Sequence, residues 1–200
     1  TEFMTQSYPY VLKKSGYNTG FIGKFGVKIE ESDSMLNAMF DYLEISRSVP
    51  HFVKMPDGSR RHSSEIKGDQ AIEFINEQSE EKPFCLSVSF NAVHAVDGNL
   101  TPGNEGHYPY PEAVAHLYEG IEMPAPRLSD PAIFENHPDF LKESFNRVRY
   151  HWRWDTEEKY QINMKAYLRM ISGYDNAMKR VLDALKEKGL DKNTIIIYAA

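Results

Sequence analysis

The chain has 200 residues, of which 41% are hydrophobic, and its formal net charge is -6. This composition supplies enough apolar side chains for a folded core and excludes wholesale disorder. The acidic balance argues against nucleic acid as the main partner, and it requires any anionic ligand to be held by a local cluster of donors. A single cysteine excludes an internal disulfide. No apolar stretch approaches the ~20 residues that a membrane span requires.

Short helices and strands alternate along the first 90 residues. A helix is expected over residues 7–15, bounded by Ser7 and Gly16, and a glycine-rich strand over 19–25. The apolar periodicity predicts a short helix near residues 35–40 and a longer one over 64–78. The near-continuous apolar run 84–90 is typical of a strand that is buried on both faces of a parallel sheet.

The second half begins with a long excursion. Residues 97–154 are rich in Pro, His, Asn and aromatic residues, which is typical of a functional loop, with one short helix expected over 136–145. A long helix then begins at Asp155, with Gly173 as a candidate kink, and residues 194–198 form another apolar strand. The order of elements predicts an α/β fold with a mainly parallel sheet flanked by helices.

Two polar residues lie directly beyond predicted strands. Lys24 stands between glycines at the end of the first strand, and His94 follows the second. Ligands of parallel sheets collect outside the carboxyl ends of the strands. A lysine ammonium and an imidazole N–H that converge at this edge could bind a tetrahedral oxyanion and stabilise charge on a leaving oxygen. By position alone, however, such a lysine is a solvated surface residue, and such a histidine is a satisfied structural one.

Other motifs give weaker indications. Four histidines are too widely spaced for a recognisable metal motif: His107, His116, His137 and His151. Trp152 and Trp154, which alternate with Arg153, could line a sugar-binding cleft or could anchor a loop. Cys85 lies inside an apolar run, so a buried and inert thiol is expected. The triplet that begins at Asn99 fits a glycosylation sequon, which also arises by chance.

Three segments resemble the type I sulfatases of the alkaline-phosphatase-like superfamily. They are residues 10–25, with the motif Gly23-Lys24, residues 82–95, which end near His94, and residues 167–198. They occur in the order that the family has. The resemblance implies that residues 1–200 are the central part of an N-terminal catalytic domain, with the excursion 97–154 near the substrate pocket.

The resemblance also implies a chemistry. In this family a formylglycine, made from Cys or Ser in a C/S-x-P-x-R motif, attacks sulfur, and a calcium ion polarises the sulfate. By the same resemblance, Lys24 and His94 are the catalytic and substrate-binding residues. The motif is absent here, so we expect the formylglycine and the calcium ligands outside these 200 residues and assign no metal ligand within them. Two departures are Gly26, where the family often has His, and Val93, where it has Pro.

We therefore predict part of a sulfuric ester hydrolase that acts on a sulfated carbohydrate or an aryl sulfate, so its ligand is a sulfated small molecule or glycan. The chain alone is expected to be inactive, because its partner is the remainder of its own polypeptide. The family suggests a periplasmic or secreted location. Two alternatives stay open: a phosphodiesterase or phosphonate hydrolase of the same superfamily, and a non-catalytic domain that keeps the fold.

Overall fold

The computed structural model describes residues 2–27, 32–46, 50–102 and 105–199. They fall into two compact units, and each unit is described by itself. The first comprises Thr1–Asn91 and Tyr174–Ala200, and the second comprises Ala92–Gly173. No helix within the described ranges is both long and apolar enough to cross a membrane.

A parallel sheet forms the centre of the first unit. Its strand order is β2-β1-β5, with β1 (Asn18–Gly23) between β2 (Tyr42–Ile45) and β5 (Phe84–Ser89). Both pairings are parallel, and the register sets Gly23 beside Ile45 on one side and Ser89 on the other. Because β1 lies between two neighbours, the carboxyl ends of three strands meet at one edge of the sheet.

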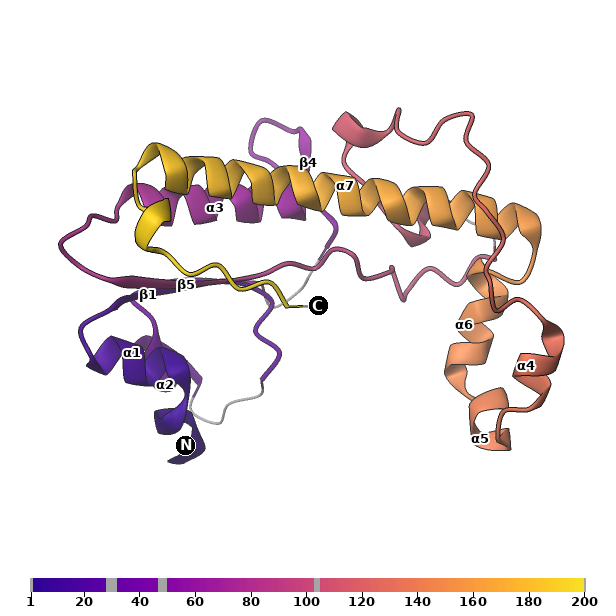
Figure 1. Cartoon of the computed structure of the whole chain (residues 1–200), viewed down its shortest axis with the longest axis horizontal. Helices are drawn as coiled ribbons and strands as arrows, with labels where there is room; N and C mark the ends of the chain where they lie inside the picture. Colours follow the sequence, from indigo (N-terminus) through magenta and orange to yellow (C-terminus); the bar gives the residue numbers. More distant parts are fainter. Residues whose placement is uncertain (1, 28–31, 47–49, 103–104, 200) are drawn as a thin grey trace. The chain divides into compact units, whose positions relative to one another are not determined.

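Helices cover both faces of this sheet (Figure 1). On one face, α1 (Tyr8–Lys14) and α2 (Ser32–Met39) enclose a core cluster of Phe21, Leu36, Met39 and Phe40. On the other face lie α3 (Ser63–Asn76) and the C-terminal half of α7 (Glu157–Glu187), which bury Phe74, Ile75, Leu185 and Leu190. The first unit is therefore a three-layer α/β/α arrangement, and the predicted fold class is confirmed.

A two-stranded hairpin precedes α3. Its strands β3 (Phe52–Lys54) and β4 (Arg60–His62) pair antiparallel, and Gly58 has a φ of 86° in the turn that the Asp57-Gly58 pair predicts. The hairpin leads directly into α3, whose first turn has a capping box made by His62 and Glu65.

The second unit is built around the N-terminal half of α7. Its core cluster contains Tyr108, Ala166 and Met170. Short helices precede α7 in chain order: η2 (Glu105–His107), η3 (Glu112–Val114), α4 (Pro131–Glu135), α5 (Asp139–Lys142) and α6 (Phe145–Arg153). The chain also has η1 (Glu2–Gln6) and η4 (Asp191–Asn193).

Four expectations need correction. The expected strand 194–198 is not a strand, because no neighbouring strand pairs with it within the described residues. Its side chains are largely exposed, with Ile195 at 88%. The expected helix 136–145 is replaced by the separate helices α5 and α6. Strand β5 is half-buried along its length, since it has β1 on only one side. Finally, α7 runs without interruption through Gly173.

Gly173 allows α7 to pack closely against a neighbouring segment and does not kink the helix. A Cβ at this position would lie 2.5 Å from Cγ of Pro111, within the second unit. Gly23 is restricted more severely, because its φ is 105° and a Cβ would lie 1.9 Å from the Ser89 carbonyl oxygen. Gly23 therefore ends β1 at a point where the backbone of β5 leaves no room for a side chain.

Gly23→Ala should lower the free energy of unfolding by about 3 kcal/mol or more, since it adds both backbone strain and a clash with backbone. Urea denaturation followed by circular dichroism measures this. Gly26→Ala is the matched control, because Gly26 has open space around its Cα and an ordinary φ. Equal stability of the two variants would contradict the constraint assigned to Gly23.

Candidate functional site

The carboxyl edge of the sheet carries Lys24, as predicted. Its backbone N–H donates to the Ser89 carbonyl oxygen at 3.2 Å, and the Gly23 carbonyl oxygen accepts a hydrogen bond from the Ser46 N–H at 2.8 Å. These bonds fix the backbone at the ends of all three strands. The Lys24 side chain is exposed. Its ammonium group can therefore approach a ligand outside the sheet edge.

A second lysine lies beside Gly23, and the sequence analysis did not select it. Lys67 belongs to α3, and a Cβ on Gly23 would lie 3.0 Å from its Cε atom. Only 3% of Lys67 is exposed, and burial lowers its pKa below the usual value of 10.5. Two lysines, one exposed and one buried, thus flank the glycine that ends β1.

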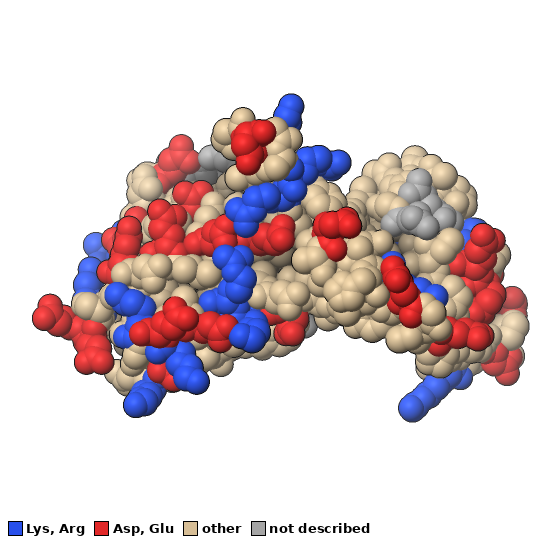
Figure 2. Space-filling model, turned by 90° about the horizontal axis from the view of Figure 1, so that it is seen from above, with Lys and Arg blue, Asp and Glu red and all other residues tan. Residues whose placement is uncertain are grey.

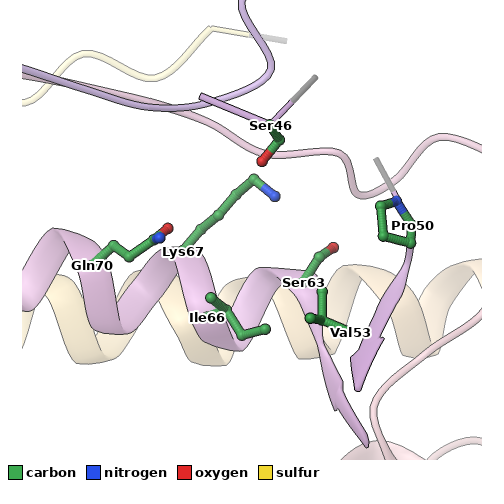
Figure 3. A pocket seen from close by; sticks show the side chains of 7 residues that line it. All are labelled: Ser46, Pro50, Val53, Ser63, Ile66, Lys67 and Gln70. Carbon is green, nitrogen blue, oxygen red and sulfur yellow. The ribbon is translucent and has the colours of Figure 1, made fainter. Parts of the chain in front are cut away.

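The side chain of Lys67 lines a small pocket within the first unit. The pocket has a volume of about 170 Å³. Figure 3 shows the Lys67 ammonium, the Ser46 hydroxyl and the Ser63 hydroxyl pointing toward one space. The remaining walls are formed by Pro50, Val53, Ile66 and Gln70. This pocket opens beside the sheet edge that carries Lys24.

One signal in the sequence could have identified Lys67. It precedes Ala71 by four residues and Phe74 by seven, so it lies on the same helical face as these buried side chains. A lysine on an apolar face is unusual, because charged side chains are rarely buried without a partner.

His94 belongs to the second unit, whereas Lys24 belongs to the first. The predicted convergence of Lys24 and His94 therefore stays a prediction. The His94 side chain is 60% exposed, and its Nε2 lies 3.8 Å from a carboxylate oxygen of Asp97. Its Nδ1 lies 2.7 Å from the Ala95 carbonyl oxygen. Because a carbonyl only accepts hydrogen bonds, Nδ1 carries a proton in this contact.

Asp97 is the centre of an ionic cluster. It lies 3.2 Å from Arg149 and 3.6 Å from Arg153. Arg153 is buried, and its Nε–H donates to Nδ1 of His107 at 3.3 Å. The other ring nitrogen of His107 contacts the Thr101 carbonyl oxygen at 2.9 Å. Burial and the neighbouring guanidinium lower the pKa of His107, which is therefore a neutral, structural residue.

The aromatic pair around Arg153 is also explained by packing. Trp154 contacts Tyr108 and Tyr160, with ring centroids 5.6 and 6.3 Å apart. Trp152 packs edge-on against Phe145 at 5.6 Å. Of the two roles that the sequence left open, these contacts favour the anchoring of a loop over a sugar-binding cleft.

The other side chains considered in the sequence were possible metal ligands and Cys85. Over the described ranges, no three His, Cys, Asp or Glu side chains are grouped so that they could hold a metal ion. Cys85 is a free thiol in β5, and burial raises its pKa, as expected of an inert cysteine. On the face that Figure 2 presents, acidic and basic side chains intermingle. Ion pairs of the first unit include those of Asp69 with Arg61 and Arg180.

Comparison with known proteins identifies related chains. The family model described as Sulfatase matches residues 4–200. An N-acetylglucosamine-6-O-sulfatase of Bacteroides thetaiotaomicron is 25% identical over 98% of this chain and 43% of its own length. An extracellular sulfatase, the SULF-1 homolog of Drosophila melanogaster, is 23% identical over 98% of this chain and 17% of its own. The chain thus spans less than half the length of these curated relatives.

A solved structure supports the fold. The protein yidJ of Bacteroides fragilis, which carries the name of a sulfatase, superposes with a TM-score of 0.57 at 22% identity. The superposition covers 92% of this chain and 41% of the other. At this level of identity, the likeness concerns the fold alone.

Arg153→Met should destabilise the second unit by about 2 kcal/mol, because His107, Asp97 and the Val96 carbonyl would each lose a buried hydrogen-bond or charge partner. Hydrogen exchange of the amides near His107 should accelerate in parallel. Arg127→Met, at an exposed position, is the control. If both variants unfold at the same urea concentration, Arg153 does not have this anchoring role.

Proposed function

The chain belongs to the sulfatase family, and from that membership we propose that it forms part of the substrate site of a sulfuric ester hydrolase. The observation that carries the proposal is the position of Lys24, directly beyond Gly23 at the carboxyl edge of the parallel sheet. The same Gly-Lys pair is the family motif whose lysine contacts the sulfate. Ligand sites of such sheets occur at this edge.

Lys24 would neutralise the transferring group. Its ammonium can contact two oxygens of a sulfate ester, whose negative charge grows on the bridging oxygen as the S–O bond breaks. Hydrogen bonds fix the backbone on both sides of Gly23, so the lysine starts from a defined position, and its exposed side chain is accessible to a ligand. Lys24 would then bind the transition state, in which charge develops on the bridging oxygen, more strongly than it binds the substrate.

His94 would protonate the leaving oxygen. Since the Nδ1–H group donates a hydrogen bond to the Ala95 carbonyl oxygen, Nε2 can donate a hydrogen bond only when the ring is the imidazolium. In that form Nε2 would transfer its proton to the alkoxide as the S–O bond breaks, and the neutral ring would remain. A carboxylate oxygen of Asp97 lies 3.8 Å from Nε2. The proposal requires the whole protein to bring His94 to the ligand at Lys24.

The nucleophile and the metal are proposed to come from other parts of the polypeptide. The described residues do not fit a calcium site, because no group of three acidic or histidine ligands occurs among them. Cys85 does not fit the nucleophile either, since it lies in β5 with a raised pKa. We therefore propose that the 200-residue chain alone is inactive.

The proposed substrate is a sulfated glycan. The N-acetylglucosamine-6-O-sulfatase among the relatives supports this class, and the extracellular relative supports a location outside the cytoplasm. We propose that residues 97–154 shape the pocket for the sugar. This segment is long and contains several short helices, which is typical of loops that recognise a substrate.

In the intact protein that carries this chain, Lys24→Ala should lower kcat/KM for an aryl sulfate by about 10²-fold or more, because one charge partner of the transition state is lost. Lys82→Ala is the control, since this exposed lysine precedes β5 at the opposite edge of the sheet. The 200-residue chain serves as the inactive reference. Calcium-dependent turnover by that chain, or an unchanged rate for Lys24→Ala, would disprove the respective assignment.

The role of His94 predicts a dependence on the leaving group. His94→Ala should slow the hydrolysis of a sugar sulfate by about 10²-fold or more, because an alkoxide must be protonated as it leaves. The loss should be much smaller for 4-nitrophenyl sulfate, whose phenolate leaves unprotonated. Parallel kcat measurements on the two substrates test this. Equal losses on both would indicate that His94 binds or positions the substrate without donating a proton.

A further inference from the structure

Lys67 is a buried cation whose counter-charge is missing from the described residues. It is 3% exposed, and burial lowers its pKa. Among the residues that the structure describes, no hydrogen bond or ion pair opposes this shift. Buried ammonium groups in folded proteins are usually paired, because their desolvation is costly. The position of Lys67 therefore requires a partner or serves a purpose that outweighs this cost.

The carboxylates near Lys67 have other partners. Glu65 accepts a hydrogen bond from the His62 N–H at 2.9 Å. Asp69 is paired with Arg61 and Arg180. Glu44 accepts a hydrogen bond from Nε2 of Gln70 at 3.0 Å. Within the described ranges, none of these acidic groups neutralises the lysine, and the space in front of its ammonium is the pocket itself.

A second unsatisfied donor faces the same space. Ser63 is 4% exposed and lines the pocket beside Lys67. Its hydroxyl has no hydrogen-bond partner in the part of the chain that the structure describes. The Ser46 hydroxyl approaches from the carboxyl end of β2, as Figure 3 shows. Ser63 is also the first residue of α3, a helix of 14 residues whose N-terminus favours negative charge. Hydroxyl, ammonium and helix dipole all match an oxyanion.

We propose that this pocket binds an oxyanion group of a ligand, a sulfate or a carboxylate, through Lys67, Ser63 and Ser46. At about 170 Å³ the pocket is smaller than the sites that enclose a whole drug-sized molecule, so it suits a single charged group. Pro50, Val53 and Ile66 form apolar walls that lower the local dielectric and strengthen the charge pairing. The inference rests on the burial of Lys67 and stands whether or not the protein hydrolyses sulfate esters.

Bound anion and protonated lysine stabilise each other. An oxyanion beside the ammonium would raise the pKa of Lys67 back toward 10.5, because it replaces the hydration that burial removed. Removal of the charge should not harm the ligand-free protein, since an unpaired buried cation is itself destabilising. These two consequences separate a binding lysine from a structural one.

The test compares Lys67→Met with Lys82→Met in the intact protein. Thermal unfolding and calorimetry are run with sodium sulfate, sodium acetate, or sodium chloride at matched ionic strength. The wild-type protein and Lys82→Met should gain stability from sulfate or acetate beyond the chloride effect. Lys67→Met should bind the effective anion at least about tenfold more weakly, and without anion it should unfold no earlier than the wild type. The effective salt identifies sulfate or carboxylate as the ligand group.

Three further measurements complete the test. Ser63→Ala, which removes only a hydroxyl, should weaken anion binding severalfold without unfolding the protein. An NMR titration of the lysine side chains should show a higher Lys67 pKa in the effective anion than in chloride. The Lys67-dependent response should persist in Lys24→Ala, which separates this site from the proposed catalytic one. Equal anion binding by Lys67→Met, or no response beyond chloride in the wild type, would overturn the proposal, the latter because the protein itself then supplies the counter-charge.

Discussion

The close approach of β1 and β5 is the constraint on which the first unit depends. Gly23 faces the Ser89 carbonyl so closely that no side chain fits between them. The two strands pair in parallel register, and Gly23 and Ser89 are the last residues of both at one edge of the sheet. The helical layers on the two faces then bury Phe21 on one side and Phe74 on the other. The sheet edge is thereby a fixed surface from which Lys24 projects.

Two lysines lie beside Gly23, one exposed to solvent and one buried. Lys24 is exposed at the strand end, whereas Lys67 reaches the edge from α3 and is buried beside Gly23. An exposed ammonium is fully hydrated and can meet a ligand at little cost, while a buried one must be compensated. Their proximity to one strand end gives an acidic chain a local concentration of positive charge, which is what an anionic ligand requires.

Several polar side chains of the second unit form contacts that stabilise this unit. Arg153 connects His107, Asp97 and the Val96 carbonyl, and Trp154 packs on Tyr108. His94 differs from these residues, because it is exposed and only one of its ring nitrogens is engaged at hydrogen-bond distance. His94 is the histidine of this segment that we propose to act on a ligand.

The sequence by itself determined the α/β class, the major helices and two of the three strands in the sheet, because apolar periodicity and glycine positions record burial along each local segment. It also indicated Lys24 through the Gly-Lys motif. Only the tertiary structure decided that Lys67 reaches the same edge, since its neighbours Gly23 and Ser46 are distant in the chain. The segment 194–198 shows the converse: its strand-like pattern is local, but a strand forms only where another strand supplies hydrogen bonds.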